Sequence, residues 1–212
     1  MLQNKNIVIT GALGQDGLIL SKLLLKKKFN VFGIVKKINI KKVKNVKYFK
    51  INLLDYKKTS KFLNTINPHS LIHLGTENPN YIELKRKKDF YQKNLQVVKN
   101  LVDYFSLYQP KKKLVLIGTS QMYGVFPKKV GLKSRFNPIN SYAKFRVKSY
   151  SYMLKNKAKY KTNMVTAILF NHDSMLRKKK ILIPNTRKKK VTFKRFIFVH
   201  FSPPGGVLSS KS

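Results

Sequence analysis

Short runs of branched apolar residues alternate along the chain with longer segments in which apolar residues recur every three or four positions. Such short runs are typical of strands buried on both faces, and the longer segments are typical of amphipathic helices. The predicted strands are residues 7–10, 31–35, 46–55 (running into a loop), 70–75, 113–120 and 163–170. The predicted helices are residues 18–27, 59–67, 89–108 and 141–158.

This alternation predicts an α/β protein with a Rossmann-like, doubly wound parallel sheet between helices. In the second helix we expect Thr59 or Ser60 to act as the N-cap and Pro68 to end the helix. The rhythm changes near the end of the chain, where a short alternating segment precedes a Pro-Gly-Ser stretch and predicts an added strand or a frayed terminus. We therefore divide the chain into a Rossmann domain, residues 1–185, and a divergent tail, residues 186–212.

Composition narrows the class of protein. A chain of 212 residues with 42% hydrophobic content can bury the core of one ordinary domain. It contains no cysteine, and His69, His73 and His200 form no metal-ligand spacing, so we predict no metal site. Neither a leader segment nor an apolar run long enough to span a bilayer is visible, and we predict a cytoplasmic protein with no membrane partner.

The charge is strongly one-sided, with 46 Lys+Arg against 7 Asp+Glu and a formal net charge of +39. Such a field attracts nucleic acid non-specifically. A specific footprint is usually a single stripe or patch, whereas the lysine triplets here are scattered over residues 26–28, 111–113, 178–180 and 188–190. We interpret them as solvated positions and keep a nucleic-acid-binding Rossmann protein as an alternative.

The clearest chemical motif is TGALGQDG, residues 10–17, which follows the first predicted strand and precedes the first predicted helix. Gly11, Gly14 and Gly17 allow the backbone to approach a diphosphate closely, and the unpaired amides of a helix N-terminus bind that anion. Lys36 and Lys37 follow the second strand, where cations accept a ribose 2′-phosphate. The motif predicts dinucleotide binding, with NADP favoured over NAD.

From residue 5 to about residue 185 the sequence resembles the extended short-chain dehydrogenase/reductase family, and within it the GDP-mannose 4,6-dehydratases. The similarity is carried by TGALGQDG, GIVKK, SLIHLGTE, GTSQMYG, FNPINSYAKFR and ILFNHDSMLR. It implies a substrate-binding role for Asn171. The cofactor-binding residues that it implies are Gly11, Gly14, Gln15, Asp16, Gly17, Lys36, Lys37, Asn52, Leu53, Leu74, Gly75, Tyr142, Arg146, His172 and Arg177.

The resemblance also implies a reaction, the dehydration of GDP-mannose to GDP-4-keto-6-deoxymannose with NADP recycled. Thr119 would hydrogen-bond the sugar hydroxyl and Tyr142 would act as the base. Two positions depart from the family pattern. Arg146 stands where a Lys is expected and cannot relay protons, and Gln121 replaces a proton-abstracting Glu with a neutral amide.

These departures predict weakened dehydratase activity, and they leave a nucleotide-sugar epimerase or reductase as the enzymatic alternative. A second Tyr-x-x-x-Lys match, Tyr81 to Lys85, follows the fourth strand and is interpreted as a chance match on the surface. The family continues beyond residue 185 through a part that holds much of the nucleotide-sugar, so we expect an incomplete sugar site and a truncated chain. Its members commonly pair through the Tyr142 helix, which makes a homo-oligomer possible.

Overall fold

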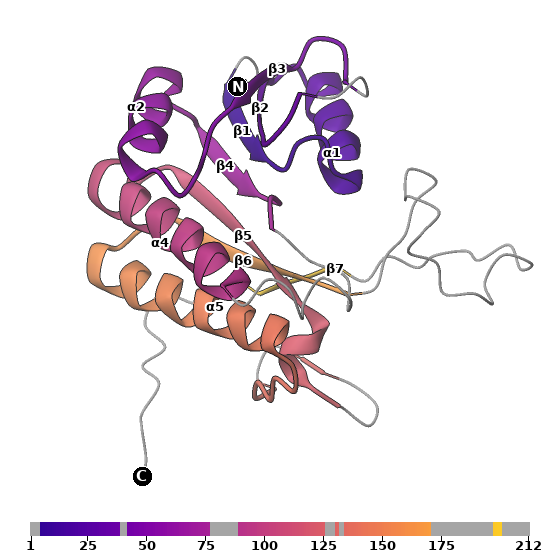
Figure 1. Cartoon of the computed structure of the whole chain (residues 1–212), viewed down its shortest axis with the longest axis vertical. Coiled ribbons are helices and arrows are strands. Elements are labelled where there is room, and N and C mark those ends of the chain that lie inside the picture. Colours follow the sequence, from indigo (N-terminus) through magenta and orange to yellow (C-terminus); the bar gives the residue numbers. More distant parts are fainter. Residues whose placement is uncertain are drawn as a thin grey trace, which may run out of the picture.

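The computed structural model describes residues 5–38, 42–76, 89–125, 130–131, 134–170 and 197–200. Its centre is a seven-stranded sheet with the order β3-β2-β1-β4-β5-β6-β7 (Figure 1). The pairings from β1 to β6 are parallel, and β7 pairs with β6 in the antiparallel sense. The strands are β1 Asn6–Thr10, β2 Asn30–Val35, β3 Lys47–Lys50, β4 Ser70–His73, β5 Lys113–Thr119, β6 Met164–Leu169 and β7 Ile197–His200.

Helices cover both faces of this sheet (Figure 1). On one face α1 packs against β1 and β2, and on the other face α2, α4 and α5 share a core with the strands. The helices are α1 Gln15–Lys26, α2 Tyr56–Ile66, α4 Phe90–Tyr108 and α5 Ser141–Tyr160, with a short 3₁₀ helix, η1, at Ser120–Tyr123. The predicted doubly wound α/β fold is therefore confirmed.

The two faces of β1 show why the pattern folds this way. Successive side chains of a strand point to opposite faces. Val8 belongs to the core under α4 and α5, whereas Ile7 and Ile9 belong to the core under α1. All three are buried. Burying each side chain contributes about 1.5–3 kcal/mol, so a strand that is apolar at every position favours a sheet covered on both sides.

Helix α2 begins earlier than the sequence predicts, because the cap is Asp55 and not Thr59 or Ser60. The Asp55 carboxylate accepts a hydrogen bond from the Lys58 amide at 3.0 Å, which satisfies one of the free N–H groups of the first turn. Thr59 is fully buried inside the helix. The predicted strand 46–55 is correspondingly shorter, since its second half forms the turn that leads to this cap.

The strand order places the carboxyl ends of β1 and β4 side by side at the point where the order of the strands reverses. In open α/β sheets this switch point is where ligands bind. The added strand predicted for the tail is present as β7. Within the described residues, none of the helices has the length and apolar character needed to cross a membrane.

Candidate functional site

The glycine turn after β1 is packed tightly against the end of β4. Gly11 has φ +68°, and a Cβ on it would lie 2.7 Å from the Gly75 Cα. A Cβ on Gly17 would lie 2.5 Å from the Gly11 carbonyl oxygen. The turn is closed by a hydrogen bond from the Gly14 amide to that same carbonyl, at 2.9 Å. Side chains do not fit at Gly11 and Gly17, and Gly14, at the start of α1, is exposed.

The amino end of α1 differs from those of α2 and α5. Gly14 is its N-cap and provides no side-chain hydrogen bond, whereas Asp55 caps α2 and Asn140 caps α5. The first intrahelical bond runs from the Leu18 amide to the Gly14 carbonyl. The backbone amides of a first helical turn favour an anion, and this end of α1 has no capping side chain to compete with one. This cradle fits the diphosphate of a dinucleotide.

Thr10 and His73 hold the end of β4 against the turn. The Thr10 hydroxyl oxygen accepts a hydrogen bond from the Gly75 amide at 3.0 Å and shares a second one with His73 Nδ1 at 2.7 Å. Both side chains are buried. Burial, together with the nearby positive charge of Arg146, lowers the pKa of His73 to about 3. His73 is therefore neutral and acts as a structural residue.

The buried His73 predicts that stability depends on pH. Its pKa is about 3 in the folded chain and about 6.5 in the unfolded chain, so between these values only the unfolded chain binds the proton. Acidification should lower the free energy of unfolding by up to about 1.4 kcal/mol per pH unit from this group. Urea unfolding from about pH 6.5 to about pH 4.5 measures this slope. His73→Asn, which keeps a polar atom toward Thr10, should show a shallower slope, and equal slopes would contradict the assignment.

Arg146 joins three segments of the chain at this end of the sheet. Its Nη1 donates to the Ile117 carbonyl of β5 at 2.7 Å, and its Nη2 donates to the Thr76 hydroxyl after β4 at 2.9 Å. Nε and Nη2 both donate to the Tyr142 hydroxyl, at 3.2 and 3.0 Å. Only 5% of Arg146 is exposed. A planar guanidinium holds its partners in fixed directions, so the Tyr142 hydroxyl is positioned relative to both strands.

A continuous path of contacts therefore links the glycine turn to Tyr142. Gly11 packs on Gly75, the next residue Thr76 is bonded to Arg146, and Arg146 is bonded to Tyr142. The predicted cofactor loop and the predicted catalytic pair lie at the same end of the sheet, around the switch point. They come from parts of the chain more than a hundred residues apart, and the fold brings them together.

Thr119 and Gln121 occupy the neighbouring strand end. Thr119 closes β5, and its hydroxyl oxygen accepts a hydrogen bond from the Gln121 amide nitrogen at 3.4 Å, at the start of η1. The Gln121 side-chain oxygen accepts a hydrogen bond from Asn140 Nδ2 at 2.9 Å. Asn140 in turn caps the helix that carries Tyr142. The four predicted catalytic positions are thus connected through β5, η1 and the start of α5.

The remaining predicted cofactor residues follow the carboxyl ends of other strands. Lys36 and Lys37 come directly after β2 and are exposed. Asn52 and Leu53 come after β3, and Leu74 comes after β4. Asn171, His172 and Arg177 lie outside the described residues, as do Tyr81 and Lys85.

Two site residues escaped the sequence analysis. Asn140 stands directly before a predicted helix, and this position is a recognised N-cap signal that could have identified it. Thr76 carries no such signal, because its role depends on a contact with Arg146, 70 positions away. Long-range contacts of this kind have no local pattern.

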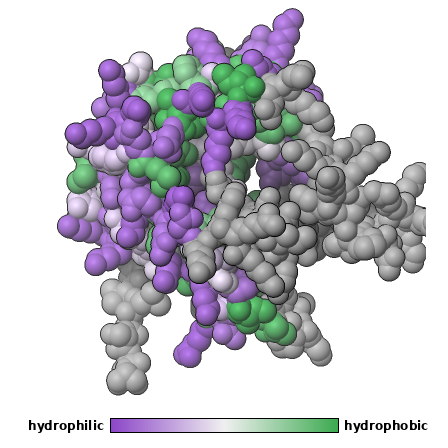
Figure 2. All heavy atoms as spheres, in the orientation of Figure 1, coloured by the Kyte–Doolittle hydropathy of each residue, from purple (hydrophilic) through white to green (hydrophobic). Residues whose placement is uncertain are grey.

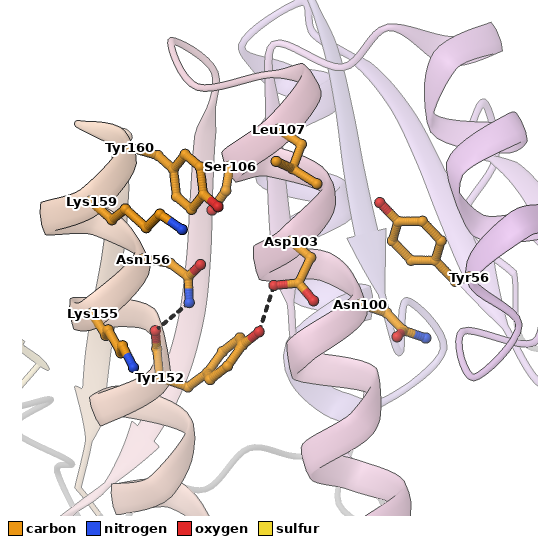
Figure 3. A pocket seen from close by; sticks show the side chains of 10 residues that line it. All are labelled: Tyr56, Asn100, Asp103, Ser106, Leu107, Tyr152, Lys155, Asn156, Lys159 and Tyr160. Atoms are coloured by element: carbon orange, nitrogen blue, oxygen red, sulfur yellow. Dashed lines mark hydrogen bonds between the residues drawn. The ribbon is translucent and has the colours of Figure 1, made fainter.

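A separate cavity of about 550 Å³ lies between α4 and α5, with Tyr56 of α2 at its edge (Figure 3). In it Tyr152 reaches from α5 and donates to the Asp103 carboxylate of α4 at 2.6 Å. Burial and this hydrogen bond raise the pKa of Tyr152 to about 12, so its hydroxyl stays protonated. None of the predicted site residues lines this cavity.

Hydrophilic side chains are spread over the face shown in Figure 2 and are not gathered into one stripe. The described lysines of the triplets 26–28 and 111–113 precede β2 and β5 at the amino end of the sheet, where β1 and β4 separate them, and most of them are exposed. This distribution agrees with solvated lysines.

Comparison with known proteins gives one family model and a consistent set of relatives. The model of the NAD dependent epimerase/dehydratase family matches residues 7–191. GDP-mannose 4,6-dehydratase of Vibrio cholerae is 24% identical over 195 residues, covering 82% of this chain and 51% of that protein. The chain thus spans about half the length of the curated relatives it matches.

Solved structures with the same fold include two nucleotide-sugar enzymes. UDP-glucose 4-epimerase from Brucella ovis, in complex with NAD, has a TM-score of 0.71 at 18% identity and matches 79% of this chain and 52% of its own. dTDP-glucose 4,6-dehydratase from Bacillus anthracis, in complex with NAD, has a TM-score of 0.73 at 17% identity and matches 85% and 59%. At these identities the likeness shows the fold.

Proposed function

Because the chain belongs to the NAD dependent epimerase/dehydratase family, we propose that it binds NADP, in preference to NAD, and acts on a nucleotide-sugar. The observation that supports this most is the contact path from Gly11 through Gly75, Thr76 and Arg146 to Tyr142. Along this path the glycine turn would hold the diphosphate and Tyr142 would meet the sugar hydroxyl at one switch point, which is what a reaction between a bound dinucleotide and a sugar requires.

GDP-mannose is the substrate that we propose. Its support is the similarity to the dehydratases of Vibrio cholerae and Caenorhabditis elegans, each 24% identical, together with the motifs that carry the resemblance. A bound nicotinamide supplies hydride transfer at the carbon bearing the sugar hydroxyl. Tyr142 takes the hydroxyl proton. Thr119 orients the same group through its O–H, while its oxygen accepts from the Gln121 amide.

For Arg146 we propose a different part from the ribose contact that the resemblance implies. Within the described part of the chain, its four hydrogen bonds go to Ile117, Thr76 and Tyr142. We propose that it positions the Tyr142 hydroxyl and leaves cofactor contact to the glycine turn. A second candidate function, epimerisation or ketone reduction of a nucleotide-sugar, is favoured by the neutral side chain of Gln121.

The test is a fluorescence titration of the purified chain with NADPH. We expect binding in the micromolar range, which corresponds to about −8 kcal/mol. An absence of binding would remove the proposal. Affinity for RNA that NADPH competes away and that falls steeply with salt would favour the nucleic-acid alternative instead.

The two lysines after β2 provide a prediction about cofactor choice. Exchanging Lys36 and Lys37 together for serine should lower the ratio of NADP to NAD affinity by about tenfold, because a charge-assisted contact to the 2′-phosphate is worth roughly 1.5–3 kcal/mol. A matched pair, Lys111→Ser with Lys113→Ser, lies at the opposite end of the sheet and should leave the ratio unchanged. Equal ratios in both variants would rule out this role for the two lysines.

A further inference from the structure

The orientation of the Gln121 side-chain amide is determined by Asn140. The Asn140 Oδ1 accepts the Ala143 backbone N–H at 2.8 Å, since an N-cap must present an oxygen to the helix. Its other terminal atom is therefore the Nδ2 donor. The atom of Gln121 that lies 2.9 Å from that donor must be an acceptor, the Oε1 oxygen. The Gln121 Nε2 group consequently points away from Asn140.

Gln121 is connected to the other predicted catalytic residues on two sides. Its backbone amide donates to the Thr119 hydroxyl, and its side chain is bonded to Asn140, two residues before Tyr142 at the start of the same helix. Gln121 is exposed, so a ligand at this end of the sheet can reach its amide. The site thus presents a hydrogen-bond donor where a base would have to present a lone pair.

We propose that Gln121 is a substrate-orienting hydrogen-bond donor, held in that sense by Asn140, and that this pair confines the chemistry to the sugar's hydroxyl carbon. The proposal rests on the proposed function. The ligand class it names is a nucleotide-sugar with a carbonyl or hydroxyl oxygen that accepts from Nε2. Asn140 acts here as a positioning residue.

The chemical consequence concerns the proton on the carbon next to a ketone. Eliminating water from a keto-sugar requires a base that takes this proton while a carbon–carbon double bond forms and the neighbouring carbon–oxygen bond breaks. A primary amide is too weak a base for that step, and its NH₂ has no basic lone pair to offer. Gln121 therefore leaves the carbon-bound proton in place, and the groups described at this site, Thr119, Tyr142 and Arg146, suit reactions that interconvert the hydroxyl and the ketone.

The first experiment follows that proton directly. The chain, saturated with NADP, is incubated with GDP-4-keto-6-deoxymannose in D₂O, and deuterium at the carbon beside the ketone is measured by NMR. The wild type should match the protein-free background, and Gln121→Glu should exceed it at least about tenfold, as general base catalysis does. Exchange by the wild type as fast as by Gln121→Glu would overturn the proposal.

The second experiment turns the side-chain amide of Gln121 around by changing Asn140 and leaving Gln121 itself unchanged. In Asn140→Asp one carboxylate oxygen still caps α5, and the other accepts from Gln121, so the glutamine turns its oxygen to the ligand. The affinity for GDP-4-keto-6-deoxymannose, measured by ligand-observed NMR, should fall about 2- to 10-fold. Gln121→Leu should lose a similar factor, and adding it to Asn140→Asp should cost little more.

Three readings separate the explanations. An unchanged Tm in Asn140→Asp shows that the cap is intact, so that a loss of affinity comes from the amide. A wild-type chain that binds NADPH but not the keto-sugar contradicts only the assignment of Gln121. The same holds if Asn140→Asp and Gln121→Leu both keep full affinity for the keto-sugar. Failure to bind NADPH contradicts the proposed function, and with it this inference.

Discussion

A Gly17→Ala variant is expected to lose about 10- to 100-fold in NADPH affinity. The added methyl group would lie 2.5 Å from the Gly11 carbonyl oxygen and 2.7 Å from the Ala12 Cα. Both are backbone atoms, so the turn itself has to shift, and the amides at the start of α1 move with it. Losing one of the hydrogen bonds that these amides donate to a diphosphate costs roughly 1.5–3 kcal/mol, which corresponds to this range.

The matched control is Gly131→Ala, because a Cβ on Gly131 meets nothing within 4 Å. Both variants lose the same backbone freedom in the unfolded chain, which cancels in the comparison. Fluorescence titration with NADPH should separate them, while circular dichroism reports whether each is folded. A folded Gly17→Ala variant that binds as tightly as Gly131→Ala would show that the cofactor is held elsewhere.

The second large effect is expected for Arg146→Ala, which should lower the free energy of unfolding by about 3 kcal/mol. The substitution removes hydrogen bonds to the Ile117 carbonyl, the Thr76 hydroxyl and the Tyr142 hydroxyl and leaves a space at a position that is 5% exposed. Unpaired polar groups and a cavity each cost free energy of this order. Urea unfolding measures the change.

Two further variants show what the guanidinium contributes. Arg146→Lys keeps the charge but lacks the planar fork, so it cannot reach all three partners and should lose roughly half as much free energy. Arg135 is exposed, so Arg135→Ala is the control for losing an arginine that is not buried. It should change the free energy of unfolding by less than about 0.5 kcal/mol. If Arg146→Ala unfolds at the same urea concentration as Arg135→Ala, the hydrogen bonds of Arg146 do not contribute to the free energy of unfolding.

The alternation of apolar runs was enough to predict the fold. Val8 and its neighbours Ile7 and Ile9 make both faces of β1 apolar. A strand of this kind is typical of a parallel sheet that is covered by helices on both sides. The glycine turn was also readable, since Gly11 and Gly17 sit between a strand and a helix. Both signals are local, because each depends only on residues close together in sequence.

The internal contacts of the site could not be predicted in the same way. From the sequence His73 was only excluded as part of a metal site, and the pairing of β1 with β4 is what places it against Thr10. The partners of Arg146 include a backbone carbonyl and the hydroxyl of Thr76, neither of which has a sequence signature. The start of α2 was misplaced for a simpler reason, because Thr59 and Asp55 are both acceptable caps and burial decided between them.

The bond between Arg146 and Thr76 closes a loop of 70 positions, and this has a consequence for how the chain acquires its chemistry. Contacts of such high sequence separation form late, after the entropy of loop closure has been overcome. The contacts of Thr10 with His73 and Gly75, which hold the glycine turn, span 63 and 65 positions. The turn and the phenol are therefore both held in place only once β4 has joined the sheet.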